Sequence, residues 1–511
     1  MAKSQPIIQN DPKGLIRFLN WIERTGNRIP HPFTVFLYLI LFVLVASWIG
    51  SYLGLSSVHP GTGKELHIKS LLSTEGVHYI LESTVDNFVK FKPLGLVLVM
   101  VLGIGLADKV GLFEATIKKV LLNAPKAAIT YGVLFAAFIG HLASDAAYVI
   151  IPPLAAMVFR SFGRHPVAGL VTGIAGVGCG FTANIFIAGT DVLLSGITTE
   201  VAQAVNPNVQ VTPIDNWYFM SLSVFVLTIA GAFITERIVE PRLGTYQGEN
   251  SEPQMIELSP LVNKALRNAM VAALIYIGFL ATVLFIPHSP LRGEDGGILT
   301  SPFMEGIIPI ILCFFIVTGL AYGITTKKVT CTADVVKFMS DSIKDMSGFI
   351  VLAFIIAQFI AYLNWSNLTM WIAVSGSEML KAVHLVGFPA ILLFTFVAVI
   401  MALLITSGSA LWSVLAPIFV PMLMLLNFHP AFIQVAYRVA DSATNMITPL
   451  NPFVAVMLGF LARYDKKAGL GTHISLIFPY TVAFLVIWII MLCLFGLLGI
   501  PVGPGVTMYL K

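Results

Sequence analysis

The sequence predicts an all-α polytopic membrane protein with about nine transmembrane helices and two oppositely oriented re-entrant hairpins. Of its 511 residues, 57% are hydrophobic and only 11% are charged, too few charges to cover the surface of a soluble globule. Apolar runs of about 20 residues can cross a hydrocarbon core of about 30 Å. Two further apolar stretches are interrupted by a polar tip. The runs lie at roughly 33–55, 93–110, 166–190, 217–236, 268–286, 303–325, 348–364, 431–460 and 475–500.

The lysines and arginines orient these runs, because the cytoplasmic side of a membrane protein collects them. Five precede the first run, and none occurs between His165 and Glu236, so the loop near 199–216 is predicted to lie outside. Four lysines follow the run 303–325, which places that loop inside. Three basic residues precede the last run. The alternation predicts a cytoplasmic N-terminus and an external C-terminus.

The first interrupted stretch, 127–160, is predicted to be a re-entrant hairpin. It follows Lys126 and ends at Arg160, so both of its ends lie on the cytoplasmic side and the chain must enter and return. Its tip, from His141 to Asp145, is polar. Irregular polar backbone at membrane depth is tolerated only where it is buried in protein or lines a wet cavity.

The second interrupted stretch, 388–425, carries the polar tip Thr406–Ser409 and is predicted to enter and leave on the outside. The run that follows, 431–460, is interrupted by polar residues at 441–445. A hairpin that faces a broken helix is a usual device of secondary transporters. In these proteins helix ends and freed carbonyls bind substrate and ion near the middle of the membrane.

The two hairpins predict an inverted repeat and an elevator-type transporter. His165 and Pro166 match His429 and Pro430, although proline is common at helix starts and chance remains an alternative. The opposed orientation of the hairpins supports the repeat independently of these residue matches. The predicted domains are an N-terminal segment with scaffold helices (1–126), the first hairpin and broken helix (127–200), further scaffold helices (201–347), a helix with the second hairpin and broken helix (348–460), and a final scaffold helix (461–511).

Four charged residues are candidates for function, because a charge inside a membrane is costly. They are Asp145, Asp191, Arg438 and Asp441. Arg438 and Asp441 are one helical turn apart and can neutralise each other as a structural pair. Alternatively, Arg438 offers a planar fork to a substrate carboxylate. Asp191 is otherwise an interfacial carboxylate, and Asp145 a helix cap.

The coupling ion is predicted to be sodium or a proton. Neutral oxygens of Ser144, Asn184, Ser407 and Asn445 lie beside the expected chain breaks and suit sodium, although polar contacts between helices explain the same residues. A proton carrier must change protonation near neutral pH, which a neighbouring cation opposes. We therefore expect Asp191, far in sequence from any cation, to carry a proton better than Asp441, with Asp145 as the second choice.

Trp412 follows the second tip closely. Its ring suits stacking on an aromatic substrate, and packing within the protein is an equally good interpretation.

Several segments together carry a resemblance to a known family. They are Gly163–Gly169, Gly178–Asn184, Thr190–Ile197, Asn216–Met220, Ser407–Trp412 and Pro417–Pro421. Through them the chain resembles the aminobenzoyl-glutamate transporter (AbgT) family over essentially its whole length, from Pro30 to Gly505.

The resemblance implies a dimeric, bacterial inner-membrane protein. It implies movement of p-aminobenzoyl-glutamate, or of related folate-pathway aromatic carboxylates, on an ion gradient without another cofactor. Some members of the family resemble sulfonamide exporters instead. His141 and Asp145 differ from the Asn and Glu of that branch, which leaves the direction of transport open. The family's functional positions fall on Asp191, Ser409, Trp412, Pro430, Arg438, Asp441 and Pro449.

Other classes of protein fit the sequence less well. Glu65 follows Gly61–Lys64 where a P-loop needs Ser or Thr, and no histidine is followed by glutamate as a zinc-protease motif requires. The net charge of +4 is spread over short loops, so no nucleic-acid partner is expected. The chain is therefore not expected to be an enzyme. An ion channel remains the rival from a different class, because hairpins with polar tips also form filters.

Overall fold

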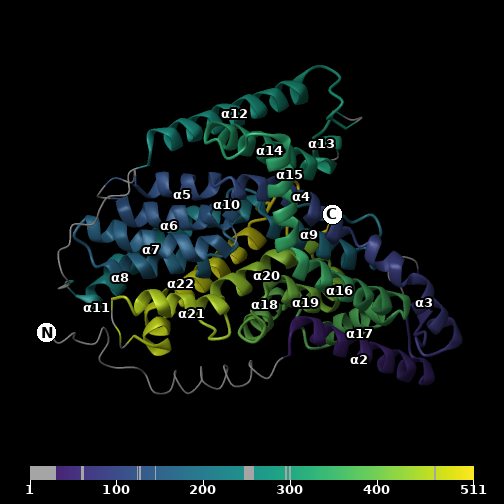
Figure 1. Cartoon of the computed structure of the whole chain (residues 1–511). Coiled ribbons are helices and arrows are strands. Elements are labelled where there is room, and N and C mark those ends of the chain that lie inside the picture. The colour runs from purple at the N-terminus through teal and green to yellow at the C-terminus, as the bar shows by residue number, and fades with distance from the viewer. Residues whose placement is uncertain are drawn as a thin grey trace.

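The computed structural model describes residues 30–510, except 59–62, 123–124, 126–127, 144, 245, 247–257, 294–295, 299–300, 465, 467 and the side chain of Asp145. One group of helices lacks the polar tips and broken helices, and a second group contains them (Figure 1). In the first group, α4 packs against α14 and α15, α12 packs on α14, and α16 packs on α2 and α3. These helices are α2 (Pro32–Tyr52), α3 (Thr74–Val89), α4 (Lys92–Lys109), α12 (Pro260–Phe285), α14 (Ile307–Thr325), α15 (Thr332–Asp345) and α16 (Ser347–Trp365).

The second group holds the polar tips and the broken helices. It consists of α5 (Leu112–Leu122), α6 (Ile129–Ile139), η2 (Gly140–Ala143), α7 (Asp145–Ser161), α8 (Pro166–Ile174), η3 (Ala175–Cys179), α9 (Gly189–Ala202), α10 (Trp217–Ile234), η4 (Thr235–Val239), α11 (Glu240–Leu243), α17 (Leu368–Ala382), α18 (Phe388–Ala402), α19 (Gly408–Met424), α20 (Pro430–Thr444), α21 (Pro452–Leu461) and α22 (Leu470–Leu497). The two groups meet where α4 packs against α9. α13 (Pro302–Glu305) is a single turn before α14.

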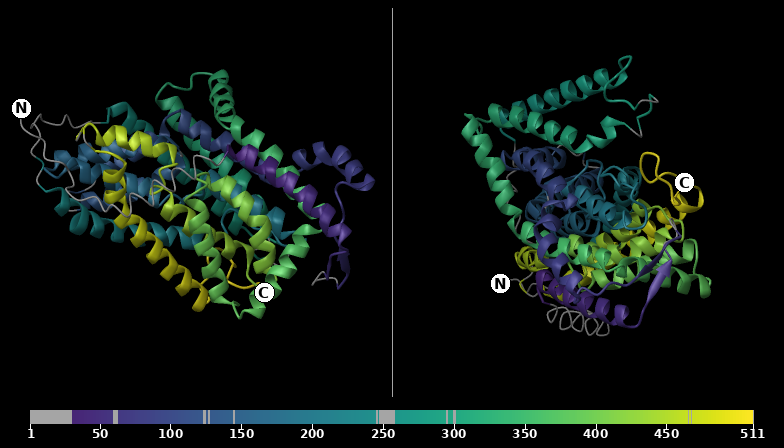
Figure 2. Two further views of the ribbon diagram at one scale, coloured as in Figure 1. Left: turned by 90° about the horizontal axis from the view of Figure 1, so that it is seen from below. Right: turned by 90° about the vertical axis from the view of Figure 1, so that its right-hand side faces the viewer.

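The pair formed by α12 and α14 projects from the rest of the molecule (Figure 2). Along α12, Met270, Leu274 and Ile275 are 64%, 64% and 67% exposed. An apolar surface of this kind suits contact with lipid or with another apolar protein surface.

Three helices begin at a His-Pro pair for the same local reason. The Nδ1 atoms of His31, His165 and His429 each accept a hydrogen bond from the backbone N–H two residues later, at 3.2 Å. The proline that follows needs no donor, because its position in the first turn has no intrahelical partner. Each His-Pro pair within the described residues therefore starts a helix, and the pair alone is weak support for a repeat.

Seven of the predicted apolar runs coincide with continuous helices of at least 18 residues. The runs 166–190 and 431–460 coincide instead with helices that break. The first break lies between η3 and α9, and α9 continues to Ala202, beyond the predicted end. The second was predicted at 441–445 but lies between α20 and α21, because α20 stays helical through Thr444. Between the first two predicted runs lie a β-hairpin, β1 (Ser56–Val58) with β2 (Glu65–His67), and then α3.

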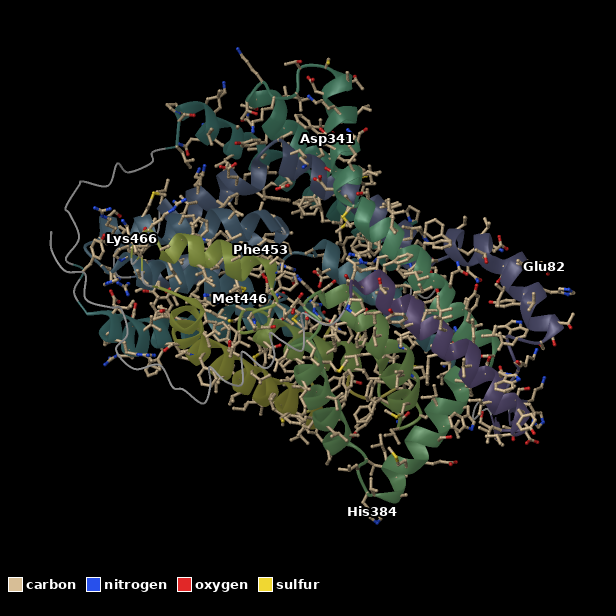
Figure 3. The ribbon with its side chains drawn as sticks, turned by 60° about the horizontal axis from the view of Figure 1, so that its bottom comes forward. Glu82, Asp341, His384, Met446, Phe453 and Lys466 are labelled. Atoms are coloured by element: carbon tan, nitrogen blue, oxygen red, sulfur yellow. The ribbon has the colours of Figure 1, made fainter. Side chains whose placement is uncertain are left out.

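Each predicted hairpin is a pair of short helices joined at its polar tip. In the first, α6 and α7 meet through η2, and in the second, α18 and α19 meet through the turn that ends at Ser407. The two broken helices cross closely, because Gly178 of η3 has no Cβ that would collide with the Met446 side chain. Figure 3 shows Met446 and Phe453 over the middle of the molecule, while Glu82, Asp341 and His384 lie toward its edges.

Candidate functional site

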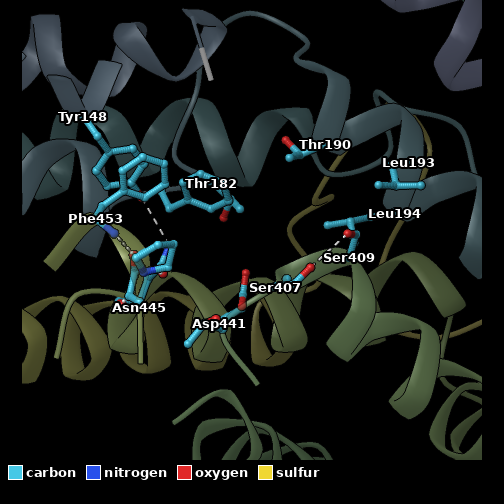
Figure 4. A pocket seen from close by; sticks show the side chains of 15 residues that line it. Tyr148, Thr182, Thr190, Leu193, Leu194, Ser407, Ser409, Asp441, Asn445 and Phe453 are labelled. Atoms are coloured by element: carbon cyan, nitrogen blue, oxygen red, sulfur yellow. Dashed lines mark hydrogen bonds between the residues drawn. The ribbon is translucent and has the colours of Figure 1, made fainter. Parts of the chain in front are cut away.

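A cavity of about 330 Å³ lies where the second hairpin tip meets both helix breaks (Figure 4). The hairpin and α20 contribute hydroxyl groups and a carboxylate, while α7, the first break and α21 contribute rings. The lining residues are Tyr148, Phe181, Thr182, Thr190, Leu193, Leu194, Thr406, Ser407, Gly408, Ser409, Asp441, Asn445, Asn451, Pro452 and Phe453. Its size falls within the range of small-molecule sites.

A buried ion pair lies beside this cavity. Nη2 of Arg438 is 2.7 Å from Oδ1 of Asp191, and the two side chains are only 1% and 4% exposed. The same Nη2 donates to the Thr182 carbonyl at 3.0 Å. Oδ2 of Asp191 accepts hydrogen bonds from Asn184 Nδ2 at 2.9 Å and from the Ala188 N–H at 2.7 Å. The pair therefore joins α20 to the first break and caps the start of α9.

The structure overturns the expected pairing of Arg438. Its ion pair is with Asp191 and not with Asp441, because the long arginine side chain turns toward α9. Asp441 instead lies against the second tip, where a Cβ added to Gly408 would come within 2.6 Å of its Oδ2. Asp191 is far from any cation in sequence, but Arg438 lies beside it in space. The ion-coupling role of Asp191 stays a prediction. Because a neighbouring cation opposes protonation and Arg438 lies beside Asp191, Asp441 is now the better candidate for carrying a proton.

Trp412 is completely buried and belongs to a polar chain between helices. Its ring stacks on Tyr437 with centroids 4.5 Å apart, and its Nε1 donates to Thr198 Oγ1 at 3.0 Å. Thr198 donates in turn to Gln434 at 2.6 Å, and Gln434 donates to Asn216 at 2.8 Å. In this structure the packing interpretation of Trp412 holds.

The remaining predicted residues separate into two sets. Ser407, Ser409 and Asn445 come together with Asp441 around the cavity, as the facing of tip and break predicted. Asn184 donates to Asp191 through its Nδ2 atom and does not line the cavity, so the structure does not bring it together with Ser407 and Asn445. Ser144 lies outside the described residues.

Two prolines and one acidic residue complete the predicted positions. Pro430 begins α20 and Pro449 lies in the second break, and neither lines the cavity. Asp145 is the first residue of α7, and its side chain lies outside the described part of the structure. Within the described residues, no group of three His, Cys, Asp or Glu side chains is placed to hold a metal ion.

Two polar residues and three aromatic residues of this region were not predicted from the sequence. Gln434 and Asn216 sit in the polar chain of Trp412, and the only available signal was their polarity beside apolar runs. Tyr148, Phe181 and Phe453 come from separate segments and read in sequence as ordinary packing residues.

A second cavity of about 290 Å³ lies on the other side of the second tip. The start of α2 forms part of its wall, including His31 and Phe36. Thr406 and Ser407 line both cavities, so the tip separates them.

The profile of the AbgT putative transporter family matches residues 17–510. The chain belongs to this family. Membership identifies this AbgT chain as a secondary transporter, and its helices fit a multi-pass protein of the bacterial inner membrane.

One relative of this AbgT chain is the p-aminobenzoyl-glutamate transport protein of Escherichia coli K12. The two are 48% identical over 491 residues, which is 96% of each chain. The structure is also similar to that of the YdaH transporter of Alcanivorax borkumensis, with a TM-score of 0.87 and 35% identity over 93% of this chain and 100% of that one. MtrF of Neisseria gonorrhoeae, described as illuminating a class of antimetabolite efflux pumps, gives a TM-score of 0.91 and 40% identity over 96% of this chain and 100% of its own.

Proposed function

We propose that this chain is an ion-coupled secondary transporter of p-aminobenzoyl-glutamate or a related folate-pathway aromatic carboxylate. The name of the Escherichia coli relative supports the substrate. The observation that carries the proposal is the cavity of about 330 Å³ between the second tip and the two breaks, which combines rings with hydroxyl groups. The first turn of α19 begins at this cavity, and its free N–H groups and dipole favour a carboxylate.

The charges around the cavity explain why such a transporter would need a coupling ion. Arg438 and Asp191 neutralise each other, so Asp441 is the uncompensated charge of the lining. p-Aminobenzoyl-glutamate carries two carboxylates, and like charges about 4 Å apart repel by roughly 4 kcal/mol at an effective dielectric constant of about 20. A proton on Asp441, or a cation beside it, removes this repulsion. The proposal therefore assigns the coupling ion to Asp441, with Ser407, Ser409 and Asn445 as neighbouring oxygens.

The same proposal includes the arrangement in the membrane. Nine spans, two of them broken, and two opposed re-entrant hairpins would divide the chain into a scaffold and an elevator-type moving core. The N-terminus would be cytoplasmic and the C-terminus external. The exposed apolar face of α12 supports contact with lipid or with a second copy in a homodimer.

The topology can be tested without substrate. In a background lacking the exposed Cys313 and Cys331, a cysteine at Asn206 should be labelled by an impermeant reagent from outside. A cysteine at Lys328 should be labelled only after permeabilisation. The reverse pattern would remove the basis for the opposed hairpins.

Transport itself can be tested in proteoliposomes. We expect saturable counterflow of labelled p-aminobenzoyl-glutamate, which a channel does not show, and net uptake on an imposed proton or sodium gradient. Asp441→Asn should retain counterflow and lose gradient-driven uptake, because the amide mimics the neutral carboxyl group. Counterflow absent from the wild type, or gradient-driven uptake retained by Asp441→Asn, would contradict the proposal.

An exporter of sulfonamides or other antimetabolites is the second candidate. It is favoured by the structural similarity to MtrF. Counterflow with a labelled sulfonamide, compared with p-aminobenzoyl-glutamate in the same vesicles, separates the two candidates.

A further inference from the structure

We propose that the aromatic ring of the substrate binds against an aromatic wall, formed by Phe181 and Phe453 and supported by the buried Tyr148, and not against Trp412. This inference rests on the proposed function and adds the orientation of the substrate within the cavity. All three rings line the cavity, and they come from α7, the first break and the start of α21.

Tyr148 is 1% exposed and lies beside both of the other rings. The Tyr148 and Phe453 rings are 4.2 Å apart and within 5° of parallel, and the Tyr148 and Phe181 rings are 6.4 Å apart. Two contacts hold these rings in place: His141 packs against Phe181 in a T-shaped arrangement at 4.5 Å, and Asn445 donates to the Tyr148 hydroxyl at 3.3 Å. Phe181 and Phe453 are only partly buried, so their rings are accessible from the cavity.

The hydroxyl groups of the second tip lie away from the rings. Figure 4 shows Tyr148 and Phe453 at one end of the cavity and Ser407 and Ser409 at the other. Ser407 caps α19 by accepting a hydrogen bond from the Ala410 N–H at 3.4 Å. An acyl-glutamate with its ring on the wall would therefore direct its carboxylates toward the hydroxyl groups and the start of α19.

Trp412 cannot offer the same surface in this structure. One face of its ring is covered by Tyr437, its Nε1 is bonded to Thr198, and none of the side chain is exposed. A protein ring can stabilise a bound aromatic ligand by stacking only when one of its faces is open to that ligand.

The test uses two ligands that differ only in aromaticity. Binding of benzoyl-glutamate and of cyclohexanecarbonyl-glutamate is measured by calorimetry on the full chain in nanodiscs, and p-aminobenzoyl-glutamate is measured alongside. The wild type should prefer the aromatic ligand by about three- to tenfold, the value of one favourable ring contact. Phe181→Leu and Phe453→Leu should each reduce this preference toward one, while Tyr148→Phe, which keeps the ring, should retain it.

Two control variants separate selectivity from stability. Phe484 is fully buried and does not line the cavity, so Phe484→Leu should leave the preference unchanged. Trp412→Phe should also leave the preference unchanged. A preference that survives both Phe181→Leu and Phe453→Leu, or that disappears in Trp412→Phe, would overturn the inference.

A structural measurement does not depend on the variants. In crystals of the wild type with p-bromobenzoyl-glutamate, the anomalous signal of bromine should lie beside Phe453, and a signal beside Trp412 would refute the wall. Equal affinity of the wild type for the aromatic and saturated ligands overturns this inference alone. Binding of neither ligand overturns the proposed substrate as well.

Discussion

The two broken helices use their polar side chains in opposite ways. At the first break, Asp191 is satisfied on every side by Asn184, the Ala188 N–H and Arg438, and it is buried. At the second break, Asp441 and Asn445 both line the cavity. The first break therefore holds the core together, and the second presents its groups to a ligand.

The comparison shows that position in a repeat does not fix the role of a charge. Both aspartates lie at a helix end beside a break, but Asp191 starts α9 and Asp441 lies in the last turn of α20. Asp191 is held by the N–H of Ala188 and by the Arg438 charge, whereas Asp441 faces the cavity and has no ion pair among the described residues. Asp441 is thus the aspartate whose charge is better placed to change during transport.

The largest expected effect is on stability. Asp191→Asn should lower the free energy of unfolding by about 3–5 kcal/mol, because it leaves the Arg438 charge buried without its partner. Asp441→Asn should lower it by less than about 1 kcal/mol, as no ion pair is broken. Denaturant unfolding in detergent measures both variants. Equal losses would remove the distinction between the two breaks.

Replacing both members of the pair is the control for this result. Arg438→Leu together with Asp191→Leu should recover much of the loss seen in Asp191→Asn, because no unpaired charge remains. A double variant as unstable as the single one would mean that packing, and not charge, sets the cost.

Arg438→Lys distinguishes the structural role of Arg438 from direct substrate binding. Lysine keeps the charge but cannot reproduce the planar contacts with Asp191 and the Thr182 carbonyl. We expect a loss of roughly 1–3 kcal/mol in stability with substrate affinity unchanged. A well-folded Arg438→Lys protein that binds substrate much more weakly would restore the carboxylate-binding interpretation.

Glycines near the two breaks offer a matched pair. A Cβ at Gly408 would come within 2.6 Å of the Asp441 carboxylate, whereas a Cβ at Gly189, the first residue of α9, meets nothing within 4 Å. Gly408→Ala should destabilise the second tip by roughly 1–3 kcal/mol, and Gly189→Ala should have little effect. Hydrogen exchange of the 406–410 amides measures this difference. Hydrogen exchange in Gly408→Ala as slow as in the wild type would show that the second tip accommodates the added methyl group without loss of stability.

The smallest effect is expected at Trp412. Trp412→Phe loses the hydrogen bond to Thr198 and keeps the stacking on Tyr437, so stability should fall by about 0.5–1.5 kcal/mol. Thermal unfolding checks the fall. A variant as stable as the wild type would show that the Thr198 contact contributes nothing.

The sequence predicted the parts of the site that depend on local chemistry. The polar tip within an apolar stretch predicted Ser407 and Ser409 as site residues, and the polar residues near the end of α20 predicted Asp441 and Asn445. All four line the cavity. Local pattern could not reveal the partner of Arg438, because Asp191 is distant in sequence and only the crossing of α20 with the first break brings them together. Tyr148, Phe181 and Phe453 come from segments that are distant in sequence, so local pattern could not group them either.

The neutrality of the Arg438–Asp191 pair has an electrical consequence. In the proposed elevator-type movement, a pair of zero net charge would contribute nothing to the charge that crosses the membrane field. The charge of Asp441 returns with the core in each complete cycle, so the net charge moved per cycle would come from the substrate and its coupling ions alone. A dianion accompanied by one cation carries one net negative charge, and moving it inward against an inside-negative potential costs about 2.3 kcal/mol per 100 mV. With this stoichiometry the membrane potential opposes uptake and drives expulsion, and at least two cations per dianion are needed before uptake becomes independent of voltage.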